Sequence, residues 1–373
     1  MKGVIGFIDC HISPELGVLT NDRPLASSSF LGRYAFIDFA LSNYCNSDID
    51  NVGILVKNHQ RSILKHLGNM MSWVENTKIG HETIFYNEKG ILNPAYNSDI
   101  NNIKQNDWVI YDTDADYLVF MPVHIIMRID LRPILEEHIL NGEDITVVYK
   151  KIENADESFE GENLFDIGKD GYVKKIYKNK GKKKIANASL STWIISRKVL
   201  SDIVNVYHGR VDASFGMKEM IAYLLDNNIY KVKAHEFTGF ARCFNSLNKY
   251  VDYSFEMLDH KKALELFNTD WPIYTCTHDT TPALYGEKAT VKNSFVSNGC
   301  IVEGRVEDSI LCRNVKIGKK SVIKNSIVLS NVTVSDSVNL NYVIIDKYAT
   351  IHPNRTLEGK EDDVLYVPQG GKI

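Results

Sequence analysis

The chain has 373 residues, of which 44% are hydrophobic and 24% charged, and its formal net charge is −4. This length allows two domains with cores of their own, and the charge gives no reason to expect nucleic acid or an anionic membrane as a partner. No apolar run reaches the roughly 20 residues that span a bilayer, and we expect no secretory signal. The six cysteines form no C-x-x-C pair, which favours reduced thiols in a cytoplasmic protein.

Strands and helices alternate over the first two-thirds of the chain. Continuous apolar runs predict buried parallel strands, and apolar residues at helical spacing predict helices between them. In chain order, strands are expected at 4–8, 51–56, 117–121 and 145–149, and helices at 33–46, 59–67 and 131–140. This order predicts an α/β fold with a doubly wound, mostly parallel, Rossmann-like sheet, whose ligands bind at the carboxyl ends of the strands.

The loop after the first strand lacks the glycines that a phosphate loop needs. Glycines there let backbone N–H groups point at a phosphate without a Cβ in the way. Residues 9–16 contain no glycine and carry the carboxylates Asp9 and Glu15. Cys10 and His11 adjoin in this loop, but no other residue supports a reactive thiol, so we interpret them as passive. The loop is therefore a poor phosphate binder.

From about residue 281 the helical spacing disappears and a repeat of about 16–17 residues begins. Three short strands per repeat predict a left-handed parallel β-helix of hexapeptide type, whose flat sides and open ends often carry subunit contacts. The corresponding segments are 309–312, 326–329 and 342–345; 315–317, 332–334 and 349–351; and Val306, Ile323 and Leu340, with a weaker coil from Val291. Before it, 246–266 is expected to be helical and 270–274 extended across a domain boundary. The expected units are 1–240, a connector at 241–280, and 281–373.

Residues 32–43 carry the most specific motif of the chain. Their sequence, GRYAFIDFALSN, resembles the G-[RK]-[YF]-R-x-I-D-F-x-L-S-N motif of glucose-1-phosphate adenylyltransferases, and 271–274 resembles the W-x-I-Y segment before that family's β-helix. The order of the two domains also fits, so the resemblance covers essentially the whole chain. It implies a nucleotidyltransferase fold and a place in glycogen biosynthesis, where ATP and glucose 1-phosphate give ADP-glucose and diphosphate.

The sequence departs from this family where the chemistry needs specific residues. Glu15 stands where the family has a phosphate-clamping Arg, and Val123 and Cys243 stand where it has its two Mg²⁺-binding Asp residues. Phosphoryl chemistry depends on Mg²⁺ to neutralise the phosphates, and neither Val nor Cys offers the oxygen that Mg²⁺ prefers. The resemblance therefore implies no catalytic residues and no cofactor in this chain, with Mg²⁺ expected only in a catalytic homologue.

A few polar residues remain as candidates for binding. Lys178 resembles the lysine of the family's E-K-P sugar-phosphate motif, and Ser189 the serine of its A-S-M-G strand. Arg23 stands near the family's effector site and is interpreted either as an effector ligand or as a loop anchor. Lysines at 178–184 predict a solvated hairpin tip or an anion site. His124 follows the lost metal position, and because no second donor is evident we interpret it as a packed or hydrogen-bonded histidine.

Three functional hypotheses follow. The first is a non-catalytic, regulatory GlgD-type subunit that joins a catalytic homologue in a hetero-oligomer, expected to be a tetramer, and modulates its activity. The second is a working nucleotidyltransferase that uses substitute carboxylates from Asp9, Asp112, Asp114 or Asp116, although the last three are more typical of an exposed turn. The third is a subunit that senses a sugar phosphate through Lys178, Ser189 and the basic loop. The isolated chain is also expected to form homo-oligomers in some conditions.

Overall fold

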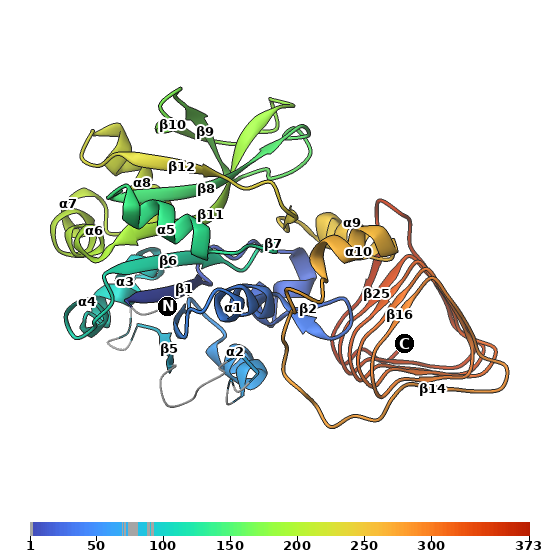
Figure 1. The fold of residues 1–373 in the computed structure, drawn as a ribbon. Coiled ribbons are helices and arrows are strands. Elements are labelled where there is room, and N and C mark those ends of the chain that lie inside the picture. Colours follow the sequence, from blue (N-terminus) through green and yellow to red (C-terminus); the bar gives the residue numbers. More distant parts are fainter. Residues whose placement is uncertain (1–2, 69, 71, 74–80, 88–89, 91–92) are drawn as a thin grey trace.

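The computed structural model of the chain describes residues 3–68, 70, 72–73, 81–87, 90 and 93–373. An α/β body built around a twisted sheet stands beside a triangular β-helix, and two connector helices lie between them (Figure 1). Both parts of the predicted fold class are confirmed. Among the described residues, no helix combines the length and the apolar character needed to cross a membrane.

The α/β body has a nine-stranded sheet with the order β10-β9-β11-β6-β1-β4-β5, and β8 and β12 extend it from β11. Strands β1, β4, β5 and β6 run parallel, as do β8 and β12, while β11 runs antiparallel to both β6 and β8. The bounds are β1 Val4–Asp9, β4 Asn51–Leu55, β5 His81–Phe85, β6 Tyr117–Pro122, β8 Ile145–Ile152, β9 Asn163–Ile167, β10 Val173–Lys178, β11 Ala186–Ser196 and β12 Val232–Glu236.

Helices cover both faces of this sheet, as a doubly wound fold requires. Apolar side chains of α1, α2 and α5 pack in one core, and those of α3, α4, α6 and α8 pack in a second core on the opposite face. The helices are α1 Phe36–Asn46, α2 Gln60–Leu67, α3 Asp99–Gln105, α4 Trp108–Tyr111, α5 Arg132–Leu140, α6 Arg197–Asp202, α7 His208–Val211 and α8 Met217–Asp226. Short turns of helix lie at Gly17–Thr20, Leu25–Ser27, Pro94–Tyr96 and Ile203–Tyr207.

Helix α1 begins three residues later than its sequence spacing predicts. Tyr34–Ala35 forms β3, which pairs with β2 at Ser29–Phe30. The Asp38 carboxylate then accepts the Ala35 N–H at 2.8 Å and so ends the extended segment. This carboxylate acts as the cap of the helix, which fixes its start.

The connector contains a strand pair as well as helices. β13 at Ala241–Cys243 pairs antiparallel with β7 at Ile125–Met127, which the sequence analysis did not predict. The helix expected over 246–266 is broken into α9 Leu247–Glu256 and α10 His260–Leu266, because Asp259 caps the second helix through the Lys261 N–H at 2.8 Å. The extended segment at 270–274 packs on α1, where the Trp271 indole N–H donates to Asn43 Oδ1 at 3.0 Å.

The β-helix consists of three five-stranded parallel sheets, one along each side of the triangle (Figure 1). Val306, Ile323 and Leu340 pair in register along one side, so the predicted repeat is confirmed. The first coil starts at β14, before the predicted weak coil. Its strands are β14 Leu284–Tyr285, β15 Thr290–Lys292, β16 Phe295–Val296, β17 Ile301–Val302, β18 Arg305–Glu307, β19 Ile310–Leu311, β20 Lys316–Ile317, β21 Val322–Lys324, β22 Ile327–Val328, β23 Thr333–Val334, β24 Asn339–Asn341, β25 Val343–Ile345, β26 Thr350–Ile351, β27 Thr356–Glu358 and β28 Leu365–Val367.

One apolar cluster joins the two parts of the molecule. Ile310, Ile327 and Ile344 of the β-helix pack with Phe36 of α1 and Tyr250 of α9. All five side chains are buried. Burial of this size fixes the α/β body against one side of the β-helix, and this arrangement creates the pocket described below.

Candidate functional site

The loop after β1 is closed by its own side chains. Asp9 is buried at the end of β1, and its carboxylate accepts the His11 N–H at 2.7 Å. The His11 ring lies between the Asn97 carbonyl, 3.2 Å from Nδ1, and Asn102 Oδ1, 3.0 Å from Nε2. Cys10 is also buried, and this burial raises the pKa of its thiol. The first part of the loop, from Asp9 to His11, is therefore held by contacts within the protein.

A second carboxylate is buried beside this loop. Asp99, at the start of α3, accepts the Met217 N–H of α8 at 3.0 Å and the Ile100 N–H at 2.7 Å. Burial raises the pKa of Asp9 and Asp99, and repulsion between the two carboxyls adds to this effect at Asp99. Helices α3 and α8 are thus tied together at the carboxyl end of β1, where a doubly wound fold would place a ligand.

Val123 and Cys243, the two expected positions of lost metal ligands, lie in neighbouring backbone segments. Cys243 pairs with Ile125, and the Phe244 N–H donates to the His124 carbonyl at 2.8 Å. Both side chains are 1% exposed. The structure thus brings the two positions together, and the space holds an isopropyl group and a thiol.

His124 is packed and hydrogen-bonded, as interpreted from the sequence, but the premise that no second donor lies near it is wrong. Its Nε2 lies 3.0 Å from Glu162 Oε1, and Cys243 places its thiol near both. The other Glu162 oxygen accepts from Ser191 Oγ at 2.8 Å and from Lys218 Nζ at 3.0 Å. Glu162 and Lys218 come from before β9 and from α8, distant in sequence from His124, so no local spacing could have revealed the cluster.

The charges of this cluster balance each other in a buried setting. Burial opposes ionisation of Glu162, but His124, Lys218 and the Ser191 hydroxyl outweigh it and hold the pKa of this carboxyl well below its usual range. Burial and the Glu162 charge raise the pKa of the Cys243 thiol. Ser191 has a φ of +46°, in the left-handed region that favours glycine. A carboxylate and an ammonium therefore fill the centre of the site.

The two candidate binding residues, Lys178 and Ser189, differ in their exposure to solvent. Ser189 is buried in β11, where its Oγ accepts the Ser191 N–H at 3.0 Å. Lys178 is exposed at the end of β10, and strand β9 separates β10 from β11. Lys178 lines a shallow surface hollow with Lys180 and Lys249. Glu15 is exposed and lines a different hollow, of about 270 Å³.

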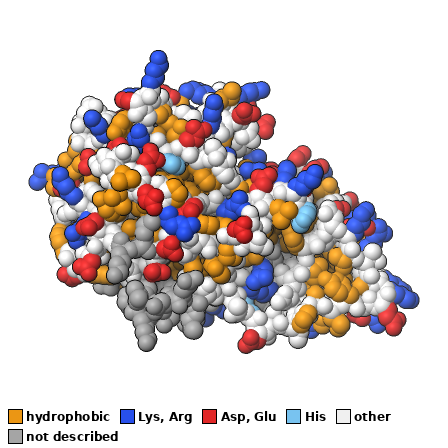
Figure 2. Space-filling model, viewed as in Figure 1, with side chains coloured by type: hydrophobic (Ala, Val, Ile, Leu, Met, Phe, Trp, Pro, Cys, Tyr) orange, Lys and Arg blue, Asp and Glu red, His pale blue; other side chains and the backbone are white. Residues whose placement is uncertain are grey.

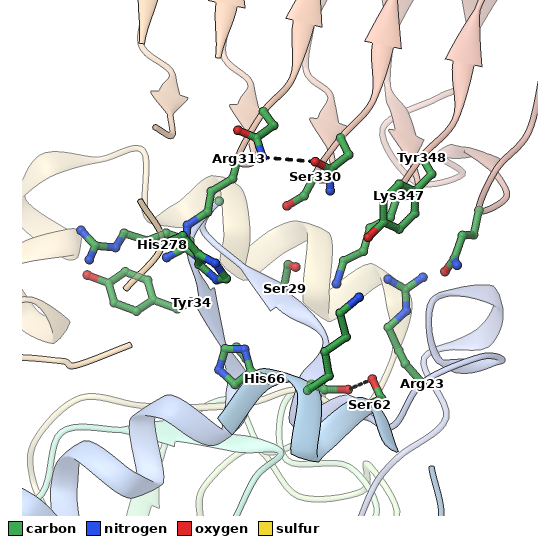
Figure 3. Close-up of a pocket in the computed structure, with 18 of the residues that line it drawn as sticks. Arg23, Ser29, Tyr34, Ser62, His66, His278, Arg313, Ser330, Lys347 and Tyr348 are labelled. Atoms are coloured by element: carbon green, nitrogen blue, oxygen red, sulfur yellow. Dashed lines mark hydrogen bonds between the residues drawn. The ribbon is translucent and has the colours of Figure 1, made fainter. Parts of the chain in front are cut away.

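An open pocket of about 380 Å³ lies between the α/β body and the β-helix. Its walls carry cationic side chains from both parts, together with hydroxyl and amide groups. Figure 3 shows Arg313 and Lys347 extending from the β-helix turns toward His66 and Ser62 of α2. The cationic and histidine lining residues are Arg23, Arg33, Lys65, His66, His278, Arg313 and Lys347, and Asp22 is the one acidic residue of the lining.

Arg23 is an anchor of this pocket and not a free cation. Its guanidinium pairs with the Asp346 carboxylate of the β-helix, and the side chains are only 6% and 3% exposed. The Tyr366 hydroxyl donates to the same Asp346 oxygen at 2.5 Å. These contacts fix the loop at residues 21–24 to the β-helix. The loop-anchor interpretation of Arg23 describes these contacts.

The remaining cations of the pocket are not neutralised in this way. Within the part of the chain that the structure describes, Arg33, Lys65, Arg313 and Lys347 form no ion pair. Burial lowers the pKa of Arg313 and Lys347, and neighbouring Arg33 and Arg23 respectively add to the effect. Elsewhere the visible face of the molecule carries charges of both signs interspersed (Figure 2). An unneutralised cluster of this kind fits an anionic ligand.

Comparison with known proteins places both parts of the chain. A family model described as nucleotidyl transferase matches residues 16–236, and one described as GlmU-like, C-terminal hexapeptide matches residues 280–363. The glycogen biosynthesis protein GlgD of Bacillus subtilis is 28% identical over 371 residues, which cover 98% of this chain and 96% of that protein. Glucose-1-phosphate adenylyltransferase of Clostridium perfringens strain SM101 is 28% identical, covering 85% of this chain and 81% of that enzyme. The Fervidobacterium nodosum enzyme of the same description is 27% identical, covering 98% and 89%.

Proposed function

The chain belongs to the nucleotidyl transferase family, and from that premise we propose that it is a catalytically inactive, regulatory subunit of glucose-1-phosphate adenylyltransferase. It acts in glycogen biosynthesis, in the cytoplasm, by modulating a catalytic homologue. The similarity to both a GlgD protein and several adenylyltransferases supports the pathway. The state of the expected catalytic centre supports the inactive role.

The observation that carries this proposal is the filling of that centre. Asp9, Val123, Ser189 and Cys243 are each 1% exposed, and Glu162 is 5% exposed. A nucleotidyl transfer site must admit ATP, Mg²⁺ and a sugar phosphate, and must place oxygen ligands around the metal. Here Val123 offers no ligand and the Glu162 carboxylate is held by Lys218. Chemistry at this position would need the cluster to be dismantled.

The substitute carboxylates of a working enzyme find little support. Asp112, Asp114 and Asp116 are exposed and precede β6, and the Asp116 N–H donates to the Gly3 carbonyl at the start of β1. Since β1 and β6 are parallel, these residues lie at the edge of the sheet opposite to the loop at 9–17. This placement confirms the exposed turn that their spacing predicted. Asp9 lies at the correct edge but is buried.

The pocket between the two parts supports a sensing role within the same subunit. Four cations without an ion-pair partner in the described chain converge on a volume of about 380 Å³, which suits a phosphorylated sugar. Lys178 and Ser189, the earlier candidates for this role, do not line it. We therefore place the effector site at Arg313, Lys347, Arg33 and Lys65, with Arg23 as the anchor that fixes the domains.

The proposed partner is the catalytic homologue, in a hetero-oligomer that is expected to be a tetramer. Flat β-helix sides and the α/β body supply the contact surfaces in this proposal. The test is to mix the purified chain with the catalytic homologue, determine the mass of the complex, and assay ADP-glucose formation with and without fructose 1,6-bisphosphate. A changed kcat or effector response in a complex of defined mass supports the proposal. Homologue activity that is identical with and without the chain, and no complex, would overturn it.

A further inference from the structure

Three different metal-binding side chains meet in the buried cluster around Glu162. His124 follows β6, Glu162 precedes β9, and Cys243 ends β13, and each offers one donor atom within 4.8 Å of the other two. The exposed fractions of His124, Glu162 and Cys243 are 0%, 5% and 1%. We propose that these three residues form a binding site for a transition-metal ion of the Zn²⁺ class.

Hydrogen bonds to neighbouring segments hold the donors in place, although only Cys243 lies within a strand. The Phe244 N–H donates to the His124 carbonyl at 2.8 Å, which fixes Cys243 and His124 in neighbouring backbone segments. Glu162 Oε2 accepts from Ser191 and Lys218, and this orients Oε1 toward His124 Nε2. Such partners around a ligand set its direction before the ion binds. One further group is free: His124 Nδ1 is buried and has no hydrogen-bond partner among the described residues.

The donor set decides which ion fits. One imidazole nitrogen, one carboxylate oxygen and one thiolate sulfur are ligands that Zn²⁺ and Co²⁺ accept in tetrahedral sites, with a fourth position left open. Mg²⁺ requires octahedral oxygen ligands, which this cluster does not supply. The site is therefore distinct from the Mg²⁺ site expected of the family, whose two positions hold Val123 and Cys243; only Cys243 belongs to both.

Binding exchanges a proton for the ion. The Cys243 thiol loses its proton as its sulfur bonds to the metal, and that proton is released to solvent, so the step is M²⁺ + Cys–SH giving Cys–S–M⁺ + H⁺. His124 would present the Nε2 lone pair to the ion while its ring keeps one proton, on Nδ1; where the ring is cationic beforehand, its Nε2 proton is released to solvent together with the thiol proton. Without the ion, Lys218 neutralises the Glu162 carboxylate at 3.0 Å, so its ammonium competes with the metal. Lys218 is therefore expected to weaken the site without being one of its ligands.

The test uses the full-length chain, stripped with a chelator and titrated with Co²⁺ alone. Thiolate ligation of Co²⁺ gives an intense sulfur-to-metal charge-transfer band, which Zn²⁺ abolishes when it displaces the cobalt. We expect one equivalent of Co²⁺ to produce this band, and C243S to lose it. C300S is the matched control, since Cys300 is equally buried but lies in the β-helix. E162Q should weaken Co²⁺ binding at least tenfold, and K218M should strengthen it.

The proposal is overturned by any of three results. The first is no charge-transfer band with a tenfold excess of Co²⁺ over the folded chain. The second is a band that persists in C243S, and the third is a band that C300S also loses. If E162Q does not fold, as judged by circular dichroism, the C243S and C300S pair still decides the question. None of these results depends on catalysis or on the regulatory role.

Discussion

The centre at the end of β1 and the pocket beside the β-helix make an instructive contrast. In the first, polar and apolar side chains are almost completely buried, and the Glu162 carboxylate is paired with His124 and Lys218. In the second, cations from both parts line an open volume, and Arg33, Lys65, Arg313 and Lys347 form no ion pair among the described residues. The chain has kept the fold that builds both places, but only the second has the space and the charge for a phosphorylated ligand. Retention of a fold is therefore separate from retention of its chemistry.

The largest effect is expected when a carboxylate is returned to the filled centre. V123D places a charge among buried side chains with no free cation beside it, and we expect about 4 kcal/mol lower free energy of unfolding, measured by urea denaturation. S330D places the same charge in the open pocket, where Arg313 and Lys347 can accept it, and should change stability by about 1 kcal/mol or less. Equal stability of V123D and the wild-type chain would show that the centre is not filled.

The next largest loss of stability is expected when the ion pair between Arg23 and Asp346 is broken. R23A leaves the Asp346 carboxylate buried and unpaired, which should lower the free energy of unfolding by about 3–5 kcal/mol. The double variant R23A/D346A removes both charges and should recover part of this loss. R33A, in the same pocket but exposed, serves as the control and should cost little. An R23A loss no larger than that of R33A would contradict the anchor role.

Substitution of the pocket cations should weaken ligand binding more than it lowers the stability of the fold. R313A and K347A each remove one charged donor, so the affinity for fructose 1,6-bisphosphate, measured by calorimetry, should fall about tenfold in each variant. R210A removes an exposed charge on α7, far from the pocket lining, and should leave the affinity unchanged. An equal loss of affinity in R210A would mean that the net charge of the chain, and not the pocket, determines binding. Absence of binding by the wild-type chain would contradict the sensing role.

The smallest effect is a pH dependence at the closed loop. The pKa of Asp99 is raised to about 7 from its usual 3.8, because burial and Asp9 disfavour its charge. The folded chain thus binds more protons than the unfolded chain between these values, so its stability falls as pH rises from about 4 to about 7. D99N keeps an acceptor oxygen and should flatten this slope in urea titrations. D114N, at an exposed aspartate, is the control, and a wild-type slope in D99N would contradict the assignment.

Much of the fold followed from local patterns, and the site did not. The repeat at Val306, Ile323 and Leu340 predicts a β-helix because identical sides recur at a fixed spacing, and each coil only needs its neighbours. The sequence does not predict the pairing of β7 with β13, because these strands have three residues each and are far apart in sequence. The start of α1 shifted because the Asp38 cap overrides helical spacing.

The candidate sites show the same limit of local information. The motif comparison aligned Val123 and Cys243 with the family's two metal-binding positions, since each lies in a recognisable segment, and the structure brings these segments together. It could not find Glu162 or Lys218, which reach His124 only through the tertiary fold. Arg313 and Lys347 occupy equivalent positions two coils apart, so the repeat places them on one edge of the β-helix, but the α2 residues that face them reach the pocket only through the tertiary fold.

The most direct test of the filled centre is the activity of the isolated chain. The purified protein is assayed for ADP-glucose formation at millimolar ATP, glucose 1-phosphate and Mg²⁺, beside a mock purification that lacks the chain. The account predicts no turnover above that blank, because Val123, Cys243 and the Lys218–Glu162 pair occupy the place of the metal. Turnover that follows the folded chain through purification, and that V123A or E162Q alters, would contradict it.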